Sequence, residues 1–179
     1  MRSESVLMNK NDYNRSIRLE PMHLADEAEV DRLLDKLTRY SMLVDGVPKM
    51  RDGARHLLTA TPPGKTAEDK HVFKVVYGAD TVGIVDIIKD YPRSGVAFIG
   101  LLAIAEDRHR QGLGRETYQA VEALAQQQMK ASIIRLAIVD TNPVEGFWER
   151  MGFGRTGEVS PYTGEAVVGN AVLMEKALR

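Results

Sequence analysis

The order of the predicted elements indicates an α/β (α+β) fold with one mixed, mostly antiparallel sheet and helices on both faces. The chain has 179 residues, 44% of them hydrophobic, which suits one well-filled core and is short for two ordinary domains. Three consecutive β-rich segments joined by short turns predict an antiparallel meander, and helices and strands alternate after it. We expect residues 15–179 to form a single domain and residues 1–14 to form a flexible tail.

The first elements are predicted to be a short strand and two helices. Residues 16–20 resemble a strand that ends at Pro21. Apolar residues at three- and four-residue spacing predict one long helix over residues 23–43, with acidic residues in its first turns, where the helix dipole favours them. A second helix over residues 49–60 is expected to stop before Pro62.

The predicted meander follows. Residues 72–77 and 81–88 are rich in β-branched and aromatic residues, and residues 78–80 form a turn between them. A second turn at residues 90–95 leads to a third strand over residues 96–104. The continuous apolar sequence in this third segment indicates a strand that is covered on both faces.

The second half of the chain alternates between helical and strand periodicity. We expect a helix from residue 113 to about residue 130, a buried strand over residues 132–139 and a short helix over residues 143–151. Strands at residues 155–159 and 166–176 complete the sheet.

Composition excludes several classes of function. The formal net charge of -1 leaves no broad basic face for nucleic acid. The absence of cysteine excludes disulfides, a protein thiolate and a cysteine-ligated metal. The four histidines lack the spacing of metal ligands, so no metal is expected. The longest apolar run is too short to cross a bilayer, so we expect no membrane association and a cytoplasmic location.

The change from strand to helix near residue 110 is the most informative part of the sequence. Arg110-Gln111-Gly112-Leu113-Gly114-Arg115 opens a helix whose first N–H groups have no internal partner. Two glycines leave room for an anion and two arginines supply charge, so the segment is suited to a pyrophosphate. The alternative is an ordinary turn with solvated arginines. A dinucleotide fingerprint fits less well, because the third glycine is missing and the segment follows an antiparallel meander.

At these residues the sequence resembles the GNAT superfamily of N-acetyltransferases. Their motif (Gln/Arg)-x-x-Gly-x-(Gly/Ala) is matched from His109 to Gly114, with both glycines present and His109 departing at the first position. Arg108 and Arg110 flank that position. A second segment from Asn142 to Phe153 has the family's Asn, short helix, aromatic pair and Gly-Phe. The resemblance extends over about residues 17–178.

The resemblance implies a GNAT-like fold that binds acetyl-CoA as cosubstrate. The pantetheine arm would pair with the backbone of the strand at residues 96–104, and the pyrophosphate would lie over residues 110–115. Asn142 would contact the arm and Phe147 would pack near it, although Asn142 is equally a helix N-cap and Phe147 equally a core residue. The expected cofactor-binding residues are Leu102, Ala103, Ile104, His109, Arg110, Gln111, Gly112, Leu113, Gly114, Arg115, Asn142 and Phe147.

Acyl transfer to an amine needs a base, and such enzymes often use a tyrosine of the aromatic pair as the acid. Asp86 interrupts an apolar strand and is the candidate base, unless it faces solvent or pairs with an arginine; Asp140 is a weaker candidate. The tyrosine position holds Trp148, whose indole cannot supply a proton. Tyr162 is the candidate acid, and Tyr91 and Tyr118 are further possibilities that no motif places at the sulfur.

The resemblance therefore implies an acetyl-CoA-dependent N-acetyltransferase that acts on an amine of a small molecule or protein. The alternative is an acyl-CoA-binding sensor or partner protein without turnover, which the loss of the tyrosine at Trp148 keeps open. A homodimer is common in such proteins. The sequence leaves the acceptor and the oligomeric state undetermined.

Overall fold

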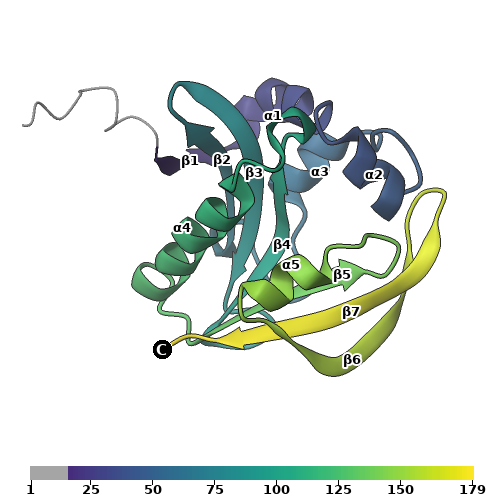
Figure 1. Ribbon diagram of the computed structural model, residues 1–179. Helices are drawn as coiled ribbons and strands as arrows, with labels where there is room; N and C mark the ends of the chain where they lie inside the picture. The colour runs from purple at the N-terminus through teal and green to yellow at the C-terminus, as the bar shows by residue number, and fades with distance from the viewer. Residues whose placement is uncertain (1–15) are drawn as a thin grey trace, which may run out of the picture.

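A single seven-stranded sheet in the order β1-β2-β3-β4-β5-β7-β6 forms the centre of the molecule (Figure 1). The computed structural model describes residues 16–179, so the predicted tail over residues 1–14 lies outside the described part. The strands are β1 (Ile17–Met22), β2 (Lys70–Tyr77), β3 (Asp80–Lys89), β4 (Val96–Ile104), β5 (Ile133–Val139), β6 (Gly154–Thr163) and β7 (Val168–Ala177). Within residues 16–179, only β4 and β5 pair in parallel. The mixed, mostly antiparallel sheet predicted from the sequence is therefore confirmed.

Helices cover both faces of the sheet and divide the core into two clusters (Figure 1). The helices are α1 (Glu27–Leu34), α2 (Thr38–Val44), α3 (Gly53–Thr59), α4 (Leu113–Gln127) and α5 (Glu145–Arg150). The larger cluster packs α4 and α5 on the sheet through residues such as Val121 and Trp148. The smaller cluster packs α1 and α3 on the other face through Val30 and Ala54. None of the helices in the described part of the chain is long and apolar enough to cross a bilayer.

The single long helix predicted over residues 23–43 is wrong, because the chain bends between α1 and α2. The backbone carbonyl of Lys36 accepts a hydrogen bond from the N–H of Glu106 at 3.2 Å, so it is not used in a continuous helix. The Glu106 carboxylate accepts a second bond from the N–H of Arg39, in the first turn of α2. A helix start leaves such N–H groups without partners, and Glu106 satisfies one of them from a distant loop. The bend turns α2 onto the sheet at the end of β4.

The remaining differences concern the ends of elements. Strand β6 extends to Thr163, beyond the predicted end at residue 159, and pairs with β7 over much of its length. Helix α5 begins at Glu145 and Val144 is its N-cap, two residues later than expected. Asn142 therefore precedes the helix and does not cap it.

The edges of β4 and β5 separate part of the way along the sheet. Their pairing begins at Val96 opposite Ile133 and ends at Ile99 opposite Leu136. Beyond that point β5 remains paired with β7, while the β5-facing side of β4 has no strand partner among residues 16–179. Figure 1 shows β5 and β7 crossing the lower part of the molecule while β4 continues upward. An extended strand presents N–H and C=O groups along such a free edge.

A bulge at Gly100 marks the point of separation. Asp86 of β3 is opposite Leu101 and the next residue is opposite Ile99, so Gly100 is the extra residue in β4. A Cβ atom at Gly100 would lie 2.6 Å from Oδ2 of Asp86. Only glycine leaves space there for the Asp86 carboxylate.

Candidate active site

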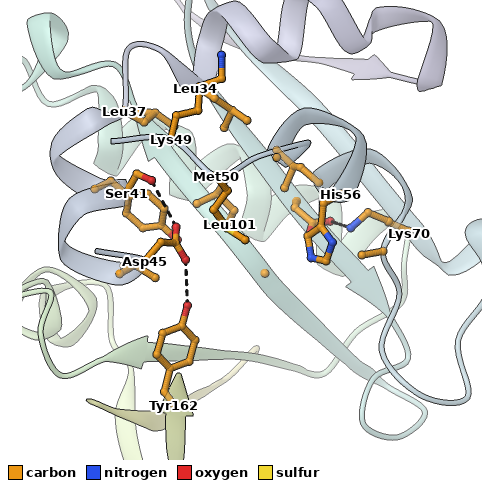
Figure 2. Close-up of a pocket in the computed structure, with 17 residues that line it drawn as sticks. Leu34, Leu37, Ser41, Asp45, Lys49, Met50, His56, Lys70, Leu101 and Tyr162 are labelled. Atoms are coloured by element: carbon orange, nitrogen blue, oxygen red, sulfur yellow. Dashed lines mark hydrogen bonds and ion pairs between the residues drawn. The ribbon is translucent and has the colours of Figure 1, made fainter. Parts of the chain in front are cut away.

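Three neighbouring hollows open at the free end of β4. The turn cleft, about 710 Å³, lies at the start of α4 between Arg110 and Arg150. The strand cleft, about 300 Å³, lies along β4 beside Asn142. The side cavity, about 270 Å³, lies between the sheet and helices α1–α3 (Figure 2). Asp86 is one of its lining residues.

Shared residues connect these hollows into one path. The turn cleft and the strand cleft have four lining residues in common, which are Leu102, Ile104, His109 and Phe147. A small gap of about 60 Å³ between β4 and β5 joins the strand cleft to the side cavity. Tyr40 lines the strand cleft, the gap and the side cavity, and Gly100 lines the gap and the side cavity. The path, as we call this series of hollows, therefore runs from the start of α4, past the separation of β4 and β5, to the side cavity that Asp86 lines.

The start of α4 has the geometry of an anion site. Gly112 is the N-cap of this 15-residue helix with φ +80°, in the left-handed region that favours glycine. Leu113 is buried and holds the first turn against the core. A Cβ atom at Gly114 would touch the Phe147 ring at 3.5 Å, which is an ordinary contact. Gly112 is thus required by the backbone, whereas the Phe147 ring leaves room for a Cβ atom at Gly114.

Three arginines supply positive charge to the turn cleft. Arg110, Arg115 and Arg150 line it, and none of the ion pairs within residues 16–179 involves them. Arg108 also lines the cleft, but its guanidinium is paired with the Asp80 carboxylate. Arg150 was not predicted from the sequence. It lies one helical turn after Phe147, and residues at this spacing share a helix face.

Two residues of the predicted motif have other surroundings. The His109 ring nitrogen Nε2 lies 2.8 Å from the backbone oxygen of Ile104, so the imidazole braces the loop between β4 and α4. Gln111 is exposed and lines neither cleft. A ligand role for Gln111 stays a prediction.

The strand cleft combines the free backbone edge of β4 with a wall from α5. Leu102, Ala103 and Ile104 form one side, and Asn142, Phe147 and Trp148 form the other. The Phe147 ring packs against Trp148 with centroids 5.0 Å apart, so it is partly a core residue as well as a wall of the cleft. Trp148 is only 7% exposed.

Asp86 lies at the inner wall of the side cavity. It is 8% exposed, and its Oδ1 accepts a hydrogen bond from Nζ of Lys70 at 2.9 Å. The carboxylate therefore pairs with a lysine, so both sequence alternatives, a solvent-facing side chain and a pair with an arginine, are wrong. Burial raises the pKa of Asp86, and the neighbouring Lys70 opposes that shift. Asp140, the weaker candidate base, is exposed and accepts hydrogen bonds from the backbone and side chain of Asn170.

Tyr162 reaches the same cavity from β6. Its hydroxyl donates a hydrogen bond to Oδ1 of Asp45 at 3.3 Å (Figure 2). Burial and the nearby Asp45 raise the pKa of Tyr162 to about 12. The two other tyrosines considered lie elsewhere: the Tyr118 hydroxyl is buried in the core, and Tyr91 packs on Phe98 near the opposite end of β4.

Several residues of the site were not predicted from the sequence, which are Tyr40, Asp45, His56, Lys70 and Arg150. Tyr40 and Asp45 belong to α2 or its C-cap, and the predicted continuous helix concealed their approach to β4. Lys70 is adjacent to Asp86 only through the pairing of β2 with β3. The one available signal was a lone carboxylate within an apolar strand, which led to Asp86.

Comparison with known proteins places these features in a family. A model of the Acetyltransferase (GNAT) family matches residues 34–153, a segment that includes both predicted motifs. Comparison with curated proteins gives no significant match.

Solved structures share the fold at low sequence identity. An acetyltransferase from Thermus thermophilus is 23% identical with a TM-score of 0.71, over 92% of this chain and 99% of that one. Spermidine N-acetyltransferase from Vibrio cholerae, in complex with CoA and spermine, is 16% identical with a TM-score of 0.69, over 90% and 95%. A Bacillus subtilis acetyltransferase in complex with CoA is 15% identical with a TM-score of 0.62, over 92% and 99%. Because the family model matches well over half of its residues, the chain belongs to the Acetyltransferase (GNAT) family.

Proposed function

We propose that the protein is an acetyl-CoA-dependent N-acetyltransferase that acts on an amine. The observation that carries this proposal is the series of neighbouring hollows from the start of α4 to the side cavity, which share lining residues and end at a buried carboxylate. A bound cofactor and an acceptor entering from opposite ends would come together at the bulge of Gly100. The structures of similar proteins that hold CoA, one of them with spermine, support the same assignment.

The described residues suit CoA along the whole path. We assign the pyrophosphate to the N–H groups that start α4 and to Arg110 and Arg115, which lack carboxylate partners within residues 16–179. Arg150 adds a third cation to this cleft. The free edge of β4 from Leu102 to Ile104 would pair with the pantetheine amides as an added strand would. Asn142, which does not cap α5, is assigned a contact with the same arm.

Acetyl-CoA supplies an acyl group on a sulfur that leaves readily. In the proposed reaction the neutral amine attacks the thioester carbon, a C–N bond forms, the C–S bond breaks and CoA thiolate departs. Asp86 takes the proton from the amine, directly or through water, and its raised pKa makes it a stronger base than an exposed aspartate. Backbone N–H groups on the free edge of β4 are assigned to the developing oxyanion.

Tyr162 is a weak choice for proton donation to the thiolate. A phenol with a pKa of about 12 holds its proton more firmly than a thiol, whose pKa is about 8.5. Full proton transfer from the phenol to the thiolate would therefore be unfavourable. We assign Tyr162 to hydrogen bonding in the side cavity and the protonation of the thiolate to water.

The proposal is tested by following free CoA thiol as purified protein, acetyl-CoA and a set of primary amines are mixed. The chain has no cysteine, so a thiol reagent reports only the released CoA. We expect release that depends on both protein and amine, together with binding of CoA by calorimetry. Binding without release for any amine would favour the sensor alternative, and no binding would refute the cofactor assignment.

Replacing Lys70 with Met is expected to shift the acidic limb of the activity profile to higher pH. Lys70 stabilises the ionised form of Asp86 and holds down its pKa, so its loss lets burial raise that pKa further. Activity requires ionised Asp86, so more alkaline solution is needed to reach the plateau. Rate against pH for the two proteins measures the shift. An unchanged limb would contradict the assignment of Asp86 as the base.

A further inference from the structure

Asp45 is a buried carboxylate without a positive partner in the described part of the chain. It is 8% exposed and lines the side cavity from the C-terminal end of α2. Its oxygens accept side-chain hydrogen bonds from neutral hydroxyl groups, those of Ser41 at 3.5 Å and Tyr162 at 3.3 Å. No ion pair within residues 16–179 includes Asp45. Enclosing a carboxylate without a cation is costly, and burial raises the pKa of Asp45 accordingly.

The cations of the cavity are engaged by other acids. Lys70 pairs with Asp86 at 2.9 Å. Lys49 pairs with Asp31 and Asp35, both at 2.8 Å. His56 lines the cavity but makes no ion pair within 4 Å among residues 16–179. The side cavity therefore has a negative charge that its own lysines leave uncompensated.

The uncompensated charge of Asp45 lies apart from Asp86 in the side cavity. In the view of Figure 2, Asp45 and Tyr162 lie on one side and His56 and Lys70 on the other, with Met50 and Leu101 between them. Asp86 is with Lys70 at the second side. Apolar side chains, among them Leu37 and Met50, also line this cavity. A ligand that suits both sides has an alkyl body and polar groups at its two ends.

We propose that the acceptor is an aliphatic diamine, whose second ammonium group binds Asp45 while the reacting amine lies toward Asp86 and Gly100. This inference rests on the proposed function for the reacting end but concerns the opposite end of the cavity. The bound ammonium supplies the charge that Asp45 lacks. An amine with a carboxylate in place of the second ammonium would bring a like charge to Asp45 and bind poorly.

The test compares three amines with the same chain of five carbons: 1,5-diaminopentane, pentylamine and 5-aminopentanoate. Binding to the CoA-loaded protein is measured by calorimetry, and turnover by thiol release. We expect the diamine to bind at least about tenfold more tightly than pentylamine, and 5-aminopentanoate to bind most weakly. Asp45→Asn should bring the diamine to within about twofold of pentylamine while leaving pentylamine unchanged, because one charge-assisted hydrogen bond corresponds to roughly tenfold or more.

Glu165→Gln is the matched control, since it removes a carboxylate that acts on Asp45 through space but is itself exposed on the β6–β7 turn. It should keep the preference for the diamine. Equal binding of diamine and pentylamine to the wild type, or an unchanged preference in a folded Asp45→Asn protein, would overturn the inference. Diamine binding that depends on Asp45 without any turnover would uphold this site and refute the acetyltransferase activity. Thermal unfolding of each variant establishes that it is folded.

Discussion

Replacing Asp86 with Asn is expected to lower kcat at least about 100-fold while changing the affinity for CoA by less than about twofold. A positioned general base contributes about 10²–10⁴ to the rate, and the amide cannot accept the proton. Asp86 lies on β3, across the bulge from Gly100, and lines none of the cleft at the start of α4. Steady-state kinetics at saturating acetyl-CoA, with calorimetry of CoA, separates the two effects.

Asp140→Asn is the comparison variant for this prediction. Asp140 is the weaker candidate base, and its carboxylate is exposed and occupied by Asn170. We expect it to retain most of the wild-type kcat. A loss of turnover in Asp140→Asn, with activity kept in Asp86→Asn, would move the base to the end of β5.

Reversing the charge of both arginines of the turn, by Arg110→Glu with Arg115→Glu, is expected to weaken CoA binding at least about 100-fold. Removing one charge-assisted hydrogen bond costs about 1.5–3 kcal/mol, and a factor of ten in affinity corresponds to about 1.4 kcal/mol. The two side chains line the cleft from the loop and from the first turn of α4. The substitution leaves Gly112 in place, so the left-handed backbone at the N-cap is not strained. Calorimetric titration with CoA measures the loss of affinity.

Arg93→Glu provides a control for the change of charge. Arg93 is exposed in the turn before β4, at the end of that strand opposite the cleft. A change of net charge acting at long range would weaken CoA binding in this variant too, whereas a local contact predicts wild-type affinity. Retained CoA binding by the Arg110/Arg115 double variant would remove the pyrophosphate from the start of α4.

The sequence predicted the parts of the fold that depend on local pattern. Strands β2, β3 and β4 are segments rich in β-branched residues that short turns separate. The helical periodicity of α4 begins directly after the glycine turn. The bend between α1 and α2 has no comparable local signal. It depends on Glu106, about seventy residues later in the chain, which bonds to the backbone of Lys36 and Arg39.

The same distinction between local patterns and contacts of residues far apart in the chain applies to the candidate site. Gly112 and Gly114 form a contiguous motif, so the cleft at the start of α4 was accessible to inspection of the sequence. The partners of Asp86 and Tyr162 were not, because Lys70 approaches through strand register and Asp45 through the bend of α2. The spacing of apolar residues predicts that Tyr40 lies on the apolar face of a helix. That spacing gives no sign of the cavity beside Tyr40.

The contacts of Glu106 also have a thermodynamic consequence. Its short loop joins β4 to the cofactor end of the path, while its backbone N–H and carboxylate bind the junction of α1 and α2, which carries Tyr40 and leads to Asp45. A ligand that stabilises this loop also stabilises the position of α2, so the two ends of the path share part of their ordering free energy. Linkage is reciprocal, so any change in affinity that occupation of one end causes at the other acts by the same factor in the reverse direction.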